Sequence, residues 1–167
     1  MASYALRLAP LRPLSFALTS VAKNVAKNHP GLFRRLGEYG DASFVLDPTD
    51  LPFVILLNPN SGTPSVIATR RSTKTTTRIA GPFAALLGLV HGKFDGDALF
   101  FSRNLVIEGD TSAALALRNA IDDAELDLAQ EFLSPSSPLS APLQRFLTYL
   151  EQMSGVCFIR PEDTQEW

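Results

Sequence analysis

The hydrophobic period of this chain changes once, near residue 42, and that change constrains the fold more than any other feature. Before it, apolar residues recur at helical spacing: Leu14, Leu18, Val21, Ala22 and Val25. This spacing predicts an amphipathic helix from about Pro13 to Asn28, and a shorter helix is expected over 32–36. After residue 42, short β-branched and apolar runs alternate with turn residues. The chain is therefore expected to be of the α/β class, in the α+β arrangement.

Five strands are expected after this point, and a helical segment separates the fourth from the fifth. The strands are predicted over residues 42–46, 53–57, 65–70, 75–80 and 99–108. The second strand, FVILL, is apolar at every residue, as is typical of a strand covered on both faces. The loop that follows it, NPNSGTP, is suited to joining neighbouring antiparallel strands. The helical segment begins at Pro82, a residue that favours the first turn of a helix.

The stretch FFSRNLVIEGDTSAALALRNAIDD, residues 100–123, combines a strand, a Gly-Asp turn and a helix. A glycine turn before a helix can bind phosphate, but such loops need several converging N–H groups. Here Gly109 stands alone, and the carboxylate of Asp110 would repel a phosphate. We therefore expect a structural turn, with Asp110 or Thr111 as the N-cap of the helix. The predicted buried stripe of that helix is Ala113, Leu117, Ala120 and Ile121.

Few residues of this chain suit catalysis or metal binding. There are two histidines and one cysteine, which is poor material for a zinc site. His29 is expected to cap a helix, and Asp95 and Asp97 are expected to form a turn. We therefore predict no catalytic residue, no metal site and no cofactor. The single Cys157 excludes an internal disulfide and favours a reducing, cytoplasmic compartment.

The charge of the chain is unevenly distributed, although the net charge is only −2. Residues 1–40 contain six basic residues and one acidic residue, whereas residues 104–131 contain one basic and seven acidic residues. Two solvated faces would explain this, and so would an anionic partner for the basic end. The predicted membrane contacts are Arg12, Lys23 and Lys27. No apolar run reaches the ~18 residues of a membrane span, and no aromatic stripe accompanies the basic residues, so nucleic acid is not an expected partner.

The end of the predicted sheet carries a family resemblance. The strand ending LVIEGD, followed directly by an alanine- and leucine-rich helix, resembles the end of the sterol carrier protein type 2 (SCP2) domain. This resemblance covers about Pro13 to Asp127. It implies a five-stranded, mostly antiparallel sheet covered by helices, with an apolar tunnel between the two. Residues 1–12 would then be an N-terminal extension, and 13–127 the lipid-binding domain.

Two longer motifs give a narrower resemblance within that family. RLGEYGDASFVLDPTDLPFVILLNP (residues 35–59) and DGDALFFSRNLVIEGDT (residues 95–111) are similar to the UbiT group of proteobacterial accessory factors in oxygen-independent ubiquinone biosynthesis. This resemblance implies a non-enzymatic carrier whose ligand is an isoprenoid quinone intermediate or a phospholipid. It also implies work with the hydroxylation proteins UbiU and UbiV. The expected location is the cytoplasm, with peripheral contact at the inner membrane.

The candidate ligand-binding residues gather around the predicted helix that follows Pro82. They are Phe53, Ile79, Phe83, Leu86, Leu87, Val90, Phe94, Leu99 and Phe101. Glycines at 88, 92 and 96 loosen this segment. From the residues alone, an ordinary core is the better interpretation. The family resemblance implies instead that these side chains line an apolar pocket.

The last part of the chain, residues 128–167, is expected to be a linker and an amphipathic helix. SPSSPLSAP is a proline-serine linker, and the stripe after it is Leu143, Phe146, Leu147, Leu150 and Met153. This helix could be a lid on the pocket, a docking element for a partner, or part of the core. The alternative function is therefore a protein-interaction adapter with a vestigial pocket, which docks partner enzymes through this helix.

Overall fold

The computed structural model describes residues 11–70, 74–90 and 104–124. Two helices come first, α2 (Leu11–Asn28) and α3 (Pro30–Arg35), followed by a single 3-10 turn, η1 (Gly37–Tyr39). The strands are β1 (Phe44–Pro48), β2 (Val54–Asn58), β3 (Ser65–Thr69), β4 (Thr77–Gly81) and β5 (Val106–Gly109). A second 3-10 turn, η2 (Asn60–Gly62), joins β2 to β3. The remaining helices are α4 (Phe83–Val90) and α6 (Thr111–Ala124).

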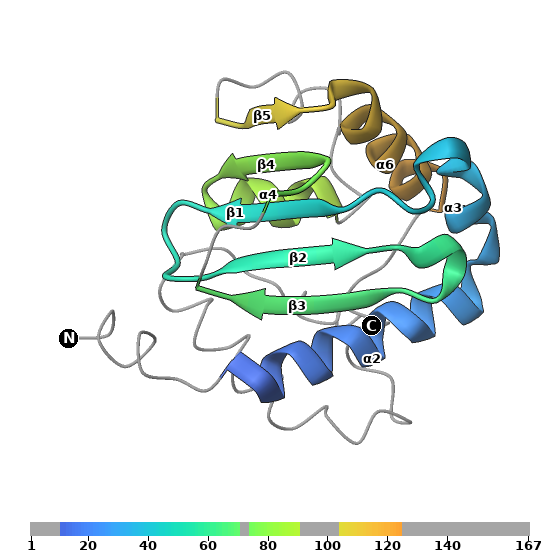
Figure 1. The fold of residues 1–167 in the computed structure, drawn as a ribbon, viewed down its shortest axis with the longest axis horizontal. Helices are drawn as coiled ribbons and strands as arrows, with labels where there is room; N and C mark the ends of the chain where they lie inside the picture. The colour runs from blue at the N-terminus through green and yellow to red at the C-terminus, as the bar shows by residue number, and fades with distance from the viewer. Residues whose placement is uncertain (1–10, 71–73, 91–103, 125–167) are drawn as a thin grey trace, which may run out of the picture.

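The five strands form one mixed sheet in the order β3-β2-β1-β4-β5 (Figure 1). Three of its four pairings are antiparallel: β1 with β2, β2 with β3, and β4 with β5. The fourth, between β1 and β4, is parallel and places Phe44 opposite Thr77. The prediction of a five-stranded, mostly antiparallel sheet is therefore confirmed. The antiparallel connection predicted for NPNSGTP is also confirmed, since β2 and β3 flank it.

The described helices cover one face of the sheet. Along each strand, alternate side chains point to this face. The largest cluster of buried apolar side chains on this face joins Phe44 of β1 to Val21 and Val25 of α2 and to Leu117 and Ile121 of α6. Figure 1 shows α4 passing behind β1 and β4, and α6 meeting α3 at one end of the sheet. The stripe predicted for α6 is confirmed, because all four of its residues are buried.

Helix α2 also covers one edge of the sheet, alongside β3 (Figure 1). Thr19 Oγ1 accepts a hydrogen bond from the Val66 N–H at 2.9 Å and donates one to the Val66 carbonyl at 2.8 Å. One turn earlier, Ser15 Oγ accepts from the Ala68 N–H at 2.9 Å. These groups would otherwise be unpaired, because β3 is an outer strand. Two hydroxyl groups of a helix therefore take the place of a further strand.

The turn between β5 and α6 is structural, as predicted. The Asp110 carboxylate accepts hydrogen bonds from the N–H groups of Ser112 and Ala113 at 2.9 and 3.1 Å, so Asp110 is the N-cap. The buried Thr77 donates its hydroxyl to the Asp110 carbonyl at 2.8 Å. The N–H groups that could have met a phosphate are occupied by the chain itself.

Two local expectations differ from the structure. β2 lies inside the sheet, but Ile55, Leu56 and Leu57 are half-buried rather than buried. Ile55 and Leu57 pack at the borders of the clusters beneath the helices, and Leu56 points to the opposite face. His29 occupies the N-cap position of α3, yet its side chain makes no capping hydrogen bond. Pro30 at the first helical position sets the start of α3 instead.

Candidate functional site

The candidate site is the apolar contact between α4 and the sheet, which we call the α4 cluster. Its buried members are Ile79 of β4, Leu86 and Leu89 of α4, Ala114 of α6, and Leu105, which directly precedes β5. Three partly buried residues pack against it: Leu46 of β1, Ala85 of α4 and Ile107 of β5. Five elements, β1, β4, α4, β5 and α6, therefore meet at one apolar centre, which is a physical requirement for burying an apolar ligand.

The start of α4 is fixed at two points. The Asp50 carboxylate accepts a hydrogen bond from the Phe83 N–H at 2.8 Å, which satisfies one of the free donors of the helix terminus. Just before α4, the backbone of Gly81 lies close to the backbone of Asn104. A Cβ atom on Gly81 would be 2.5 Å from the Asn104 carbonyl oxygen. Only glycine permits this approach. The helix is thereby held against β4 and the residues that lead into β5.

Helix α4 is apolar on every side, since its sequence is FAALLGLV. Leu86 and Leu89 point toward the sheet and are buried. Phe83 and Leu87 lie on another side of the helix and are half-buried. A surface helix normally has a polar side opposite its buried stripe. α4 has none, so its outer side is apolar as well.

The structure brings some of the predicted ligand-binding residues together and not others. Ile79 and Leu86 are both buried in the α4 cluster, and Phe83 and Leu87 lie on the same helix as Leu86. Phe53 belongs to a separate cluster with Ala68 under α2. Val90 is the last residue of α4. The remaining predictions, Phe94, Leu99 and Phe101, lie outside the described residues.

Three buried members of the α4 cluster were not predicted as ligand-binding residues. Leu89 lies three residues after Leu86, so helical spacing alone could have identified it. Leu105 precedes the part of the predicted fifth strand that forms β5, and Ala114 belongs to another helix. Neither has a local signal, because only the folded chain brings them to α4.

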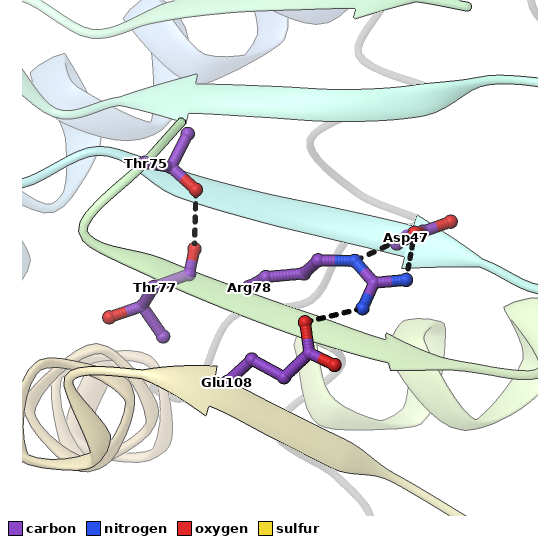
Figure 2. A network of polar contacts seen from close by, with 5 residues as sticks. All are labelled: Asp47, Thr75, Thr77, Arg78 and Glu108. Atoms are coloured by element: carbon purple, nitrogen blue, oxygen red, sulfur yellow. Dashed lines mark hydrogen bonds and ion pairs between the residues drawn. The ribbon is translucent and has the colours of Figure 1, made fainter. Parts of the chain in front are cut away.

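A polar network crosses the opposite face of the sheet (Figure 2). Arg78 of β4 donates to one carboxylate oxygen of Asp47 on β1, from Nε at 2.8 Å and from Nη2 at 2.5 Å. Its Nη1 donates to Glu108 of β5 at 2.6 Å. Hydrogen bonds to Asp47 and then Glu108 raise the pKa of the Arg78 guanidinium above its ordinary value. One cation therefore links three neighbouring strands on the side away from α4.

The three predicted membrane contacts, Arg12, Lys23 and Lys27, are all exposed on α2. In the described part of the chain, no helix is long and apolar enough to cross a membrane. Within those same residues, no group of three or more His, Cys, Asp and Glu side chains could hold a metal ion.

Comparison with solved structures places this arrangement among known proteins. A chain titled "UbiJ-SCP2 Ubiquinone synthesis protein" is similar with a TM-score of 0.58 and 17% identity, and the match covers 71% of this chain and 98% of that one. At this identity the likeness shows the fold alone. No curated protein matches the chain by sequence.

Two further solved structures are similar with TM-scores below 0.5. The sterol carrier protein domain 2 of Helicoverpa armigera matches at 0.48 and 16% identity, over 63% of this chain and 82% of its own. A crystal structure of sterol carrier protein 2 matches at 0.49 and 13% identity, over 64% and 92%.

A family model gives the decisive comparison. The model of the SCP-2 sterol transfer family matches residues 27–122, which is more than half of the chain. The matched range runs from the end of α2 through the whole sheet to α6 and includes α4. The chain therefore belongs to the SCP-2 sterol transfer family.

Proposed function

We propose that this protein is a lipid carrier that binds an amphiphilic lipid between the sheet and α4. Membership of a lipid-transfer family carries the proposal. The structure supports it with a helix that is apolar on every side and buries only part of its surface in the α4 cluster. A ligand chain against Leu87 would bury more of the apolar outer side of α4. The carrier domain would span 13–127.

The proposed ligand is a prenylated quinone precursor or a phospholipid. Support comes from the fold of the ubiquinone synthesis protein and from the motifs at 35–59 and 95–111. Such a ligand combines a long apolar tail with a small polar head, and a largely apolar site with few polar groups suits it. The protein would act as an accessory factor of ubiquinone biosynthesis. UbiU- and UbiV-like hydroxylation proteins are the proposed partners.

The proposed role is binding and presentation of the lipid, without a reaction on it. Carrying a lipid requires burial of its tail, worth roughly 0.8 kcal/mol for each CH₂ group, and needs no nucleophile or general base. The protein would work in the cytoplasm and meet the inner membrane peripherally. There Arg12, Lys23 and Lys27 would be attracted to anionic headgroups, at about 1 kcal/mol per basic residue near the surface.

A tryptophan at position 87 tests the binding site. In Leu87→Trp the larger side chain should occupy the space proposed for the ligand beside α4. We expect less lipid to co-purify and slower transfer of a fluorescent phospholipid between vesicles. The matched control is Ile67→Trp, because Ile67 is 45% exposed on β3 and points to the face away from α4. This control should transfer lipid as the wild type does.

Both variants must first be shown to be folded by circular dichroism. Unchanged lipid content and transfer in a folded Leu87→Trp protein would contradict a binding site beside α4. If the wild type itself neither holds nor transfers lipid but still forms a complex with hydroxylation proteins, the adapter function replaces the carrier function.

A further inference from the structure

Arg118 of α6 is a charged residue in a buried position. It is 7% exposed and is the one buried charged residue of the described chain. Its Nη2 atom lies 3.1 Å from a carboxylate oxygen of Asp122, whose side chain is 32% exposed. A pair spaced by four residues forms just as well on an exposed side of a helix, and burying a charge has a cost. The ion pair therefore does not explain why Arg118 is buried.

Arg118 lies next to the α4 cluster. Ala114, one turn earlier, is a buried member of that cluster, and residues four apart in a helix are neighbours on one face. The stripe that contains Leu117 and Ile121 packs in the other cluster, with α2 and β1. With 3.6 residues per turn, Arg118 follows Ala114 on the side away from this stripe. Because α6 also contacts α4, Arg118 is placed at the border of the proposed lipid site.

A guanidinium at the border of an apolar site suits the anionic head of an amphiphile. It carries its charge at every physiological pH, and its planar fork matches the oxygens of a carboxylate or a phosphate. It has five N–H donors, so it can bind Asp122 and a headgroup at the same time. The attraction between opposite charges is stronger where little water is present. A neutral amphiphile would gain none of this attraction.

We propose that Arg118 binds the anionic head of the carried lipid, a phosphate or a carboxylate, and thereby selects anionic over neutral amphiphiles. The tail would lie against the apolar residues of α4, and the head would lie where α6 borders the cluster. Asp122 would balance the guanidinium charge when no lipid is bound. This inference rests on the proposed lipid-carrier function and names the side chain that selects the class of ligand.

Two lipids with the same tails test the selection. Displacement of a fluorescent diacylglycerol from the full chain measures the affinities of dioctanoyl phosphatidic acid and of neutral dioctanoylglycerol. The wild type should prefer the phosphatidic acid, and Arg118→Met should reduce that preference by roughly tenfold or more. Methionine keeps a long apolar side chain, so the affinity for dioctanoylglycerol should change by less than about twofold. Arg118→Lys should keep part of the preference, since it retains the charge without the planar fork.

Two further variants separate headgroup binding from a structural role. Arg35→Met is the matched control, because Arg35 is paired with Asp123 of the same helix but its side chain is 59% exposed. This control should show the wild-type preference. Asp122→Asn should raise the affinity for phosphatidic acid by roughly twofold or more, because a nearby like charge is removed. A purely structural Arg118 would give no such gain.

Decanoate and decanol, measured in the same way, show whether a carboxylate serves as well as a phosphate. A preference that depends on Arg118 in one of the two pairs identifies the headgroup, and its absence from both pairs overturns the proposal. Circular dichroism must show that each variant is folded. If Arg118→Met does not fold, an unchanged preference in both Arg118→Lys and Asp122→Asn is the contradicting result.

The wild type separates this inference from the proposed function. A protein that binds phosphatidic acid and dioctanoylglycerol equally well contradicts the role of Arg118 and leaves the carrier function standing. A protein that binds neither lipid contradicts the carrier function, and the inference fails with it.

Discussion

Gly109 lies at the end of β5, with a φ of +87°. A Cβ atom at this position would be 2.4 Å from the Thr76 carbonyl oxygen, which is backbone and cannot move aside. Left-handed backbone costs other residues about 1–2 kcal/mol even without such a contact. The glycine therefore holds the close approach of the turn to the start of β4. Its role could be suspected from its place before a helix, but the contact with Thr76 joins residues far apart in sequence.

Gly109→Ala should lower the free energy of unfolding by about 2 kcal/mol or more, measured from the urea midpoint. The control is Gly31→Ala in α3, where a Cβ atom would meet nothing within 4 Å. That substitution should be neutral or stabilise by roughly 0.5–1 kcal/mol, because alanine favours a helix. Equal stability of the two variants would contradict the role assigned to Gly109.

The N-cap of α6 gives a second prediction at single residues. Asp110→Ala should destabilise the protein by about 1 kcal/mol, since the N–H groups of Ser112 and Ala113 lose their acceptor. Thr111→Ala should change stability by less than about 0.5 kcal/mol, because Thr111 is an exposed first-turn residue. The sequence left these two residues as alternatives. Urea unfolding of both variants distinguishes them, and a larger loss for Thr111→Ala would refute the assignment.

Some contacts between secondary-structure elements could not be predicted from local sequence patterns. Helical spacing correctly predicted α2, and strand patterns placed β1 to β4 within two residues of their observed limits. Nothing local indicated that Ser15 and Thr19 bond to β3, because those partners are 53 and 47 residues away. For the same reason the parallel pairing of β1 with β4 was not predicted. Partners distant in sequence are chosen by packing of the whole chain.

Thr19→Val tests the contact between α2 and β3. Valine has nearly the same shape, so the main change is that the Val66 N–H and carbonyl lose their partner. We expect a loss of about 1–3 kcal/mol in unfolding free energy. An uncovered strand edge can also pair with another chain, so size-exclusion chromatography should show more self-association. Ser20→Ala, on the same helix, should change neither measurement, and identical behaviour of the two variants would argue against edge protection by Thr19.

The Arg78 network gives another prediction at this scale. The Arg78 side chain is 32% exposed, the Asp47 side chain 21% and the Glu108 side chain 57%. Solvent therefore screens the Arg78–Glu108 pair more than the Arg78–Asp47 pair. Arg78→Met should lower stability by about 1 kcal/mol, and Glu108→Gln by less than about 0.5 kcal/mol. Urea unfolding in the same buffer provides the comparison. A larger effect of Glu108→Gln would show that Asp47 is not the main partner of Arg78.

For the molecule as a whole, the fold was more predictable than the candidate site. The five strands and the buried stripes follow from hydrophobic period, which the chain carries locally. The α4 cluster does not, since Leu105 and Ala114 join it only after folding. Apolar residues that line a ligand site and apolar residues that fill a core look alike in sequence. The proposed ligand site therefore rests on the family match and not on the residues alone.

The central claim is that the folded protein holds a lipid, and mass spectrometry of the purified protein tests it most directly. Native spectra should show the chain with an added mass, and organic extraction should yield a prenylated ring compound or a phospholipid. Leu87→Trp should lose that mass, while Ile67→Trp should keep it. Wild-type protein that carries no lipid, and that stays lipid-free after incubation with phospholipid and prenylated quinone vesicles, would contradict the account.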